Sequence, residues 1–373
     1  MKMRRFLTAL TLCFGLILNV VAGQSSDEPN EKPRKKSKKK KSDEELVTQV
    51  LPLPKELPSA ITAETARLAF FVSPPTTKGL LTAQTHEALH YLAGVSKSAT
   101  IVKLRAFVAG SGDTRRIQTL VSEAMTERKL PLPVLTTVQV GSLGVEGAQV
   151  VFEAVAVDRR PVNPEGLAFI AGQSGKTYQE AVGRVKTAVA AAGASETLSM
   201  TCFVGSLEET AAERASTALP TGLTTAVVVQ MRRETSPPAA ECEAIARLQT
   251  APASPVVFLN PDGLAKSPNY SEIALVNAPK LVFTGMQLAF HDQEADTKLA
   301  FERMAKTLET VPVKYSNVFF THTYALTEKA MEQVRNLRFN YLDKAHPPAS
   351  TLLPFEGLPS LDATFGMDII AVQ

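Results

Sequence analysis

The chain of 373 residues contains no tryptophan, and aromatic residues make up only 6% of it. A surface that stacks on bases or sugars needs aromatic rings, so this scarcity disfavours such a surface. Cysteine is also scarce: Cys13 lies in an N-terminal apolar stretch, and only Cys202 and Cys242 follow it. Two cysteines are too few for a disulfide scaffold.

The net charge is small and unevenly distributed. The formal net charge is +3, but the first 41 residues hold 11 basic and 3 acidic residues. The rest of the chain therefore holds 29 basic and 34 acidic residues, and this mild acidity disfavours a nucleic-acid groove within the fold. The apolar content of 45% is enough for two or three domains with buried cores.

Residues 1–22 have the pattern of an export signal. Lys2, Arg4 and Arg5 precede an apolar stretch from residue 6 to residue 21, and Ala22 ends it. This pattern is typical of a cleaved signal peptide, and an uncleaved anchor stays open. We therefore expect an exported protein, periplasmic or extracellular.

Residues 23–52 form a polar linker whose centre is strongly basic. Eight of the ten residues from Lys32 to Lys41 are lysine or arginine. Like charges at this density repel one another, which predicts an extended, disordered tether. The alternative is that Lys32–Lys41 contacts an anionic surface such as lipid or a cell-wall polymer.

The body of the chain contains three weakly similar copies of one unit. A short apolar strand that ends in a turn, a strand after a helix, and a closing strand recur in the same order. They lie at 70–75, 105–110 and 153–157, then at 169–173, 201–206 and 243–247, and then at 282–287, 322–327 and 368–372.

Two helical patterns separate the strands of each copy. They cover 81–93 and 113–127, then 177–192 and 206–217, and then 291–310 and 327–345. Two helices on one face of a small sheet make a two-layer α+β unit. The closing strands are apolar on both faces, so we expect the uncovered faces to pack on neighbouring copies.

The unit resembles the RidA family, also called YjgF or endoribonuclease L-PSP. The motifs that carry this resemblance are SPNYSEIALVNAPKLVFTGMQ (267–287), TAQTHEALHYLAG (82–94) and VLTTVQVGSLGVEGAQVVFEAVAV (134–157). Family members are chorismate-mutase-like trimers with ligand clefts between subunits. The resemblance therefore implies three tandem copies, 53–158, 159–250 and 251–373, which form an intramolecular pseudotrimer in a monomeric chain.

The resemblance also implies where a ligand would bind. The family arginine that clamps a substrate carboxylate falls on Leu135, Leu223 and Ser350, so no copy keeps it. The family glutamate that helps to place the attacking water survives only as Glu241, since Val151 and Gly366 replace it elsewhere. The turn residues among the survivors are expected first to maintain the hairpin, because a tight turn requires glycine. The functional alternative is one surviving cleft lined by copies 2 and 3, and its candidate residues are Gly172, Glu241, Tyr270, Thr284 and Gly285.

These substitutions favour a degenerate RidA-like protein that binds a small metabolite or a protein partner, without imine deaminase activity and without a cofactor. Without an arginine, an apolar cleft wall does not offset the free-energy cost of desolvating a small anion, and it does not orient the anion for attack. The alternative is an enamine or imine deaminase, or a related hydrolase, with a rearranged cleft and Glu241 as its catalytic candidate. Leu223→Arg is the informative substitution for this question, because copy 2 alone keeps both Glu241 and Gly172.

Two further motifs have bland explanations. His86-Glu87-Ala88-Leu89-His90 is an H-E-x-x-H sequence, which can bind zinc on a helix. Ala83, Leu89 and Leu92 fit the sheet-facing stripe, which places His86 and His90 largely toward solvent. We therefore expect no zinc site, and a zinc hydrolase at His86 and His90 is the third alternative. Cys202 and Cys242 fall on strands that are neighbours in RidA-like sheets. A cross-strand disulfide stays open there, but we expect two buried thiols.

Overall fold

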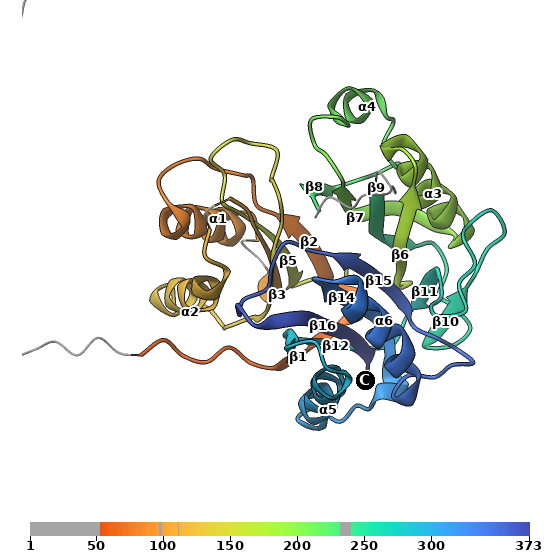
Figure 1. Ribbon diagram of the computed structural model, residues 1–373. Coiled ribbons are helices and arrows are strands. Elements are labelled where there is room, and N and C mark those ends of the chain that lie inside the picture. Colours follow the sequence, from red (N-terminus) through yellow and green to blue (C-terminus); the bar gives the residue numbers. More distant parts are fainter. Residues whose placement is uncertain (1–52, 97–98, 111, 232–239) are drawn as a thin grey trace, which may run out of the picture. The chain divides into compact units, whose positions relative to one another are not determined.

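The computed structural model describes residues 53–96, 99–110, 112–231 and 240–373 (Figure 1). The predicted export signal 1–22 and the basic segment Lys32–Lys41 lie outside these residues. Within them, helices and strands form a mixed α+β structure with three sheets, as the sequence predicted. No helix in the described ranges has both the length and the apolar character needed to cross a membrane.

The first sheet has the order β2-β5-β3-β4, in which β3 and β4 are parallel and the other pairs antiparallel. Its strands are β2 (Leu68–Val72), β3 (Thr100–Val108), β4 (Val134–Gln139) and β5 (Val150–Val157). The helices α1 (Leu81–Val95) and α2 (Ile117–Glu127) contact each other, and α1 packs on β5. Short 3-10 turns, η1 (Thr65–Arg67) and η2 (Thr114–Arg116), precede β2 and α2.

The second sheet has the order β10-β11-β6-β9-β7-β8. Its strands are β6 (Leu167–Gly175), β7 (Ala194–Val204), β8 (Thr225–Gln230), β9 (Ala240–Leu248), β10 (Val256–Leu259) and β11 (Ile273–Val276). Helix α3 (Tyr178–Ala191) packs on β6, β7 and β9. The Thr177 hydroxyl caps α3 by accepting from the Glu180 N–H at 3.1 Å. The second helix, α4 (Ala211–Ser216), is shorter than the 206–217 pattern predicted.

The third sheet has the order β1-β12-β16-β14-β15, and β13 also pairs with β16. Its strands are β1 (Ala60–Glu64), β12 (Lys280–Thr284), β13 (Gln287–Phe290), β14 (Val318–Ala325), β15 (Ala349–Pro354) and β16 (Ala363–Val372). Helix α5 (Glu294–Glu309) contacts α6 (Glu328–Leu337). A 3-10 turn, η3 (Tyr315–Asn317), precedes β14, and another, η4 (Arg338–Asn340), continues α6.

Two of the sheets contain strands from distant parts of the chain. Strand β1 precedes the first sheet in sequence, yet it pairs with β12 of the third sheet, with Ala60 opposite Thr284. The hairpin β10–β11 follows the second sheet in sequence and completes that sheet, with Ile273 opposite Ile170 on β6. Backbone hydrogen bonds therefore join residues 60–64 to the third sheet and residues 256–276 to the second sheet.

The faces that carry no helix pack against one another. One buried core draws its side chains from all three sheets, including Leu68 of β2, Phe169 of β6, Phe283 of β12 and Ile370 of β16. Phe169 packs edge-on against Phe319 of β14, with ring centroids 4.9 Å apart. This shared core brings strand ends of different sheets close together, and the polar cleft described below lies between two such sheets.

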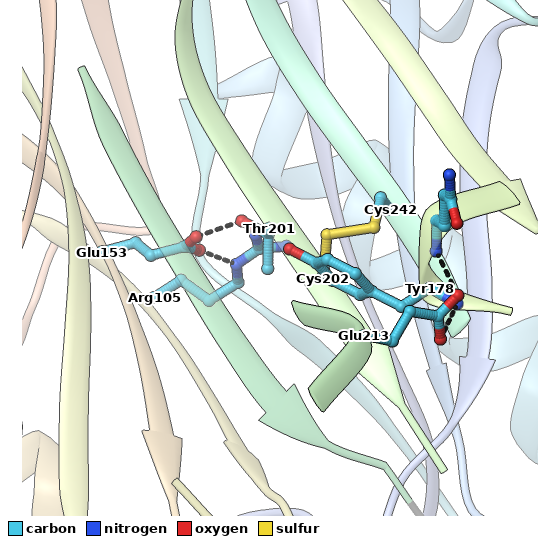
Figure 2. Close-up of a disulfide and its surroundings, with 8 residues drawn as sticks. Arg105, Glu153, Tyr178, Thr201, Cys202, Glu213 and Cys242 are labelled. Atoms are coloured by element: carbon cyan, nitrogen blue, oxygen red, sulfur yellow. Dashed lines mark hydrogen bonds and ion pairs between the residues drawn. A yellow bond between two sulfur atoms is a disulfide. The ribbon is translucent and has the colours of Figure 1, made fainter. Parts of the chain in front are cut away.

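Our expectation of two buried thiols was wrong, because Cys202 and Cys242 form a disulfide. The two residues are direct partners on the antiparallel strands β7 and β9, with Cα atoms 4.1 Å apart. Both side chains point to the same sheet face and lie within the core beneath α3. Figure 2 shows the disulfide between Arg105, Glu153 and Thr201 on one side and Tyr178 with Glu213 on the other.

Candidate functional site

A cleft of about 470 Å³ lies between the second and third sheets. We call it the polar cleft. It is lined by Gly172, Ser174, Glu241, Ser267, Asn269, Tyr270, Arg335, Arg338, Ser350 and Leu352. Three of the five candidate residues, Gly172, Glu241 and Tyr270, thus lie together, and the degenerate position Ser350 joins them.

Hydrogen bonds across the sheets hold the walls of the polar cleft. The Gly172 N–H on β6 donates to the Thr351 hydroxyl on β15 at 3.1 Å. The Ser271 N–H and hydroxyl donate to the Pro348 and Pro347 carbonyls, at 3.2 and 2.7 Å. Because the Gly172 N–H is already used in this way, it is not available to a ligand in this arrangement.

Gly172 is required by a close approach. The β6–β9 register shifts between Ile170 and Gln173, which places Gly172 in an irregular part of the strand. A Cβ atom at this position would lie 1.9 Å from Glu241 Oε1. Any side chain larger than hydrogen at residue 172 would therefore displace the Glu241 carboxyl.

Glu241 is the acidic side chain that lines the polar cleft. Its side chain is buried on β9, and the Ser174 hydroxyl donates to Oε2 at 2.8 Å. Burial raises the pKa of Glu241 to about 7, helped by the nearby Glu243 and Glu272 and opposed by the Ser174 hydrogen bond. A carboxyl group with a pKa near neutrality can both accept and donate a proton at physiological pH.

Arg338 is an unpaired cation in the wall of the polar cleft. The residue is only 4% exposed, and its Nε and Nη2 atoms are buried without a hydrogen-bond partner in the described chain. Burial lowers the pKa of Arg338 to about 10, and Tyr270 opposes that shift. The guanidinium therefore stays charged at neutral pH. Nε and Nη2 share one edge of the planar group, which is the edge that holds carboxylates bidentately.

Tyr270 and Glu272 complete the ionisable groups at the polar cleft. Burial raises the pKa of Tyr270 to about 12, with Glu272 and Glu241 adding to the shift and the two arginines opposing it. Tyr270 is thus a neutral hydrogen-bond donor. Glu272 is buried and accepts from Gln173 Nε2 at 2.6 Å, and burial also raises its pKa.

The other two candidate residues lie elsewhere. Thr284 is fully buried, and its hydroxyl accepts from the Ile369 N–H at 3.0 Å. The Gly285 N–H donates to the Ser59 carbonyl at 2.8 Å. Both residues lie near Leu135, whose carbonyl accepts from the Met286 N–H at 3.2 Å. They belong to the contact between the first and third sheets and do not line the polar cleft.

The structure also changes which degenerate position faces Glu241. Leu223 packs against the core beneath α3 and does not line the polar cleft. Ser350, on β15 of the third sheet, lines it with Glu241. An arginine at residue 223 would therefore not meet Glu241 in the polar cleft. Neighbouring strands in space, rather than the same copy, set the pairing.

Sequence reasoning missed the two arginines because it searched only the family's strand position. Arg335 lies in α6 and Arg338 in η4. Their spacing of three residues places them on one helical face. That spacing was the available signal within the 327–345 pattern.

The H-E-x-x-H residues lie on α1, where His86 is half-buried and His90 is exposed. Among the residues that the structure describes, no group of three or more histidine, cysteine, aspartate or glutamate side chains is arranged to hold a metal ion. Within that part of the chain, no third metal ligand lies beside His86 and His90.

A second buried polar group lies where the three sheets meet. We call it the charge cluster: Lys103, Arg105, Glu153, Glu243, His322 and Asp368. Arg105 Nε and Nη2 lie 2.5 Å from Glu153 and 2.6 Å from Glu243, and Thr201 donates to Glu153 (Figure 2). Lys103 Nζ lies 2.8 Å from Asp368. These pairs link the first sheet to both others.

His322 completes the charge cluster. It lies 3.1 Å from Asp368 Oδ1 through Nδ1 and 3.4 Å from Glu243 Oε1 through Nε2. Burial lowers the pKa of His322, but Glu243 and Asp368 outweigh it and raise the pKa above its ordinary value. With His322 protonated, three cations balance three carboxylates. The small chamber beside the cluster, about 70 Å³, has mainly aromatic and aliphatic walls.

Comparison with known proteins gave matches among solved structures only. The sequence matches no protein-family model and no curated protein. A member of the Rid protein family from Yersinia pestis, described as of unknown function, is 13% identical with a TM-score of 0.29. That match covers 32% of this chain and 100% of that chain.

Two further solved structures show how much the coverage of this chain varies among the matches. A YjgF/YER057c/UK114 family member from Mycobacterium tuberculosis is 17% identical with a TM-score of 0.24, and the match covers 26% of this chain and 83% of that chain. A chorismatase is 11% identical with a TM-score of 0.24, and the match covers 82% of this chain and 99% of that chain. The similar RidA/YjgF structures thus correspond to about a third of this chain, at low identity.

Proposed function

We propose that the protein binds a small metabolite with a carboxylate group in the polar cleft, with Arg338 as the anchor. The unpaired Nε–Nη2 edge of Arg338 carries this proposal. A buried cation without a partner is costly, and a bidentate carboxylate satisfies both its charge and its two N–H groups. Arg338, at the end of a helix, would thus bind the carboxylate in place of the family arginine, which is absent from the strand position.

The proposal includes the architecture that the sequence suggested: three RidA-like copies, 53–158, 159–250 and 251–373, as a monomeric pseudotrimer. Three helix-covered sheets that share one core support it. Export to the periplasm or outside the cell is part of the same proposal. The Cys202–Cys242 disulfide supports it, because disulfides persist in oxidising compartments. Lys32–Lys41 would then tether the protein or contact an anionic surface.

The test is a binding measurement on the full chain. Pyruvate is a stable small carboxylate, and its affinity is measured by calorimetry for the wild type, Arg338→Gln and Lys329→Gln. A charge-assisted contact contributes about 1.5–3 kcal/mol, so Arg338→Gln should weaken binding at least tenfold. Lys329→Gln is the matched control, because Lys329 lies on the same helix but pairs with Asp292.

Equal affinity of Arg338→Gln and wild type for pyruvate would contradict the proposal. Circular dichroism and thermal melting of the same samples verify that the variant is folded. In the described chain Arg338 has no hydrogen-bond or ion-pair partner to lose, only the Phe339 ring whose centroid lies 5.6 Å from its guanidinium carbon, so Arg338→Gln should lower the melting temperature little.

Hydrolysis of enamines or imines is the second candidate, favoured by Glu241. Its pKa of about 7 and its place opposite the arginines suit a group that activates water. The test is 2-aminoacrylate hydrolysis by wild type and Glu241→Gln. Acceleration that rises with an apparent pKa near 7, and that Glu241→Gln removes, supports this candidate. No acceleration by the wild type excludes it and leaves binding alone.

A further inference from the structure

The polar cleft contains a second cation that a single carboxylate does not use. Arg335 lies one helical turn before Arg338 on the same face and also lines the cleft. Arg335 is exposed whereas Arg338 is buried, so one guanidinium lies at the rim and the other deep in the wall. The two positive charges thus lie at different depths in the cleft.

Neither guanidinium is paired with a carboxylate of the residues that the structure describes. Arg338 Nε and Nη2 are buried without a hydrogen-bond partner, and the Arg335 side chain has no hydrogen bond or ion pair with those residues. The paired arginines of the fold differ in this respect: Arg105, Arg184 and Arg247 each have a carboxylate within ion-pair distance. The acids closest to the polar cleft hold their protons more firmly than usual, since burial raises the pKa of both Glu241 and Glu272. The cleft therefore has an excess of positive charge.

The size and lining of the polar cleft indicate the character of the ligand. Its volume of about 470 Å³ lies within the usual range for small-molecule sites, about 300–1,000 Å³. A three-carbon acid would fill only part of it. The side chains between the arginines and Glu241 are hydroxyls and an amide, from Ser174, Ser267, Asn269, Tyr270 and Ser350, and Leu352 is the apolar exception. Such walls suit a polar ligand.

Resting on the proposed function, we infer that the ligand is a small polar molecule with two separate anionic groups. Arg338 holds the inner group through its Nε–Nη2 edge, and Arg335 meets the outer group at the rim. The outer group is a carboxylate or a phosphate, because a guanidinium recognises both. Two groups on one molecule, rather than two charges on one group, match cations that lie at different depths.

The experiment compares ligands of matched size on the full chain at low ionic strength, where charge effects are least screened. Succinate carries two carboxylates, butyrate one, phosphoglycolate a phosphate and a carboxylate, and methyl phosphate two charges on one group. Affinities are measured by calorimetry for wild type, Arg335→Gln, Arg335→Lys and Arg338→Gln. Lys329→Gln again serves as the control.

We expect the wild type to bind succinate or phosphoglycolate at least tenfold more tightly than butyrate and methyl phosphate. The tighter of the two identifies the outer group. Arg335→Gln should remove this preference while butyrate affinity changes less than threefold, and Arg335→Lys should retain part of it. Arg338→Gln should lower the affinity for all four ligands.

Three results would overturn the inference, and only the third would also overturn the proposed function. If butyrate binds through Arg338 but succinate and phosphoglycolate bind no better, the second anionic group is absent and the proposed function stands. If Arg335→Gln leaves the preference for succinate or phosphoglycolate over butyrate intact, Arg335 does not bind the outer anionic group. If no anion binds, or Arg338→Gln changes nothing, the proposed function fails together with the inference.

Discussion

Glu241 should make the protein less stable as the pH rises, and Glu241→Gln should remove that loss. The folded-state pKa is about 7 against an ordinary value of 4.5, because burial disfavours the ionised form. Below about pH 4.5 the carboxyl is neutral in both states. Between about pH 4.5 and 7 the unfolded chain releases a proton that the folded chain keeps, so the free energy of unfolding falls.

The size of this effect follows from the shift. One pKa unit corresponds to about 1.4 kcal/mol, so a shift from 4.5 to about 7 costs roughly 3 kcal/mol of stability above pH 7. Glutamine cannot ionise, and its amide oxygen can still accept from the Ser174 hydroxyl. Glu241→Gln should therefore match the wild type near pH 5 and exceed it by roughly 3 kcal/mol at pH 8.

Equilibrium urea unfolding at half-unit steps from pH 4.5 to 8.5 measures the difference directly. Glu123→Gln is the control, because Glu123 is exposed on α2 and should show no such trend. A constant difference between Glu241→Gln and wild type across this range would refute the reasoning. A variant that loses stability relative to wild type as the pH rises would refute it as well.

Three further predictions follow from the described contacts. The raised pKa of His322 means that the protonated imidazole stabilises the fold fully below its unfolded pKa, and that this stabilisation is lost as the pH rises above about 6.5. His322→Gln should therefore show a smaller fall in the free energy of unfolding over this range. Urea unfolding between pH 6 and 9 tests this. Reduction of the β7–β9 disulfide in urea should lower the free energy of unfolding by about 2–4 kcal/mol, and equal unfolding curves with and without reductant would contradict it. Ser350→Arg should strengthen pyruvate binding and lower the pKa of Glu241, whereas Leu223→Arg should change neither; calorimetry and the pH profile of binding separate the two.

The strands of the fold could be predicted from the sequence because each is marked by a short apolar run. Segments 105–110 and 153–157 begin within β3 and β5, where buried side chains on both faces favour such runs. The sheet to which an opening strand belongs could not be predicted. β1 is short and only partly buried and β11 is a run of four apolar residues, so neither sequence marks a partner, and their pairing with β12 and β6 depends on residues far away in the chain.

The candidate site was predictable only in part, for a similar reason. Gly172, Glu241 and Tyr270 lie together because each keeps its place on the strand or turn that the resemblance assigned. Arg338 was outside that search, since it lies on a helix end rather than on a strand. The charge cluster also escaped notice, although Glu153, Glu243 and Asp368 begin the same closing strand in each copy. Single charges in apolar strands were the overlooked signal.

The pairing of β1 with β12 has a consequence for how the chain folds. Strand β1 emerges early during synthesis, yet its partner Thr284 lies in the last third of the sequence. The second sheet likewise waits for β10 and β11. Contacts between such distant residues slow folding, because the entropy of a long loop is lost before the contact forms. A chain that ends near residue 250 would leave β1 without its partner strand and β6 without a neighbour on one side, so we expect such a fragment to aggregate rather than fold as two separate units.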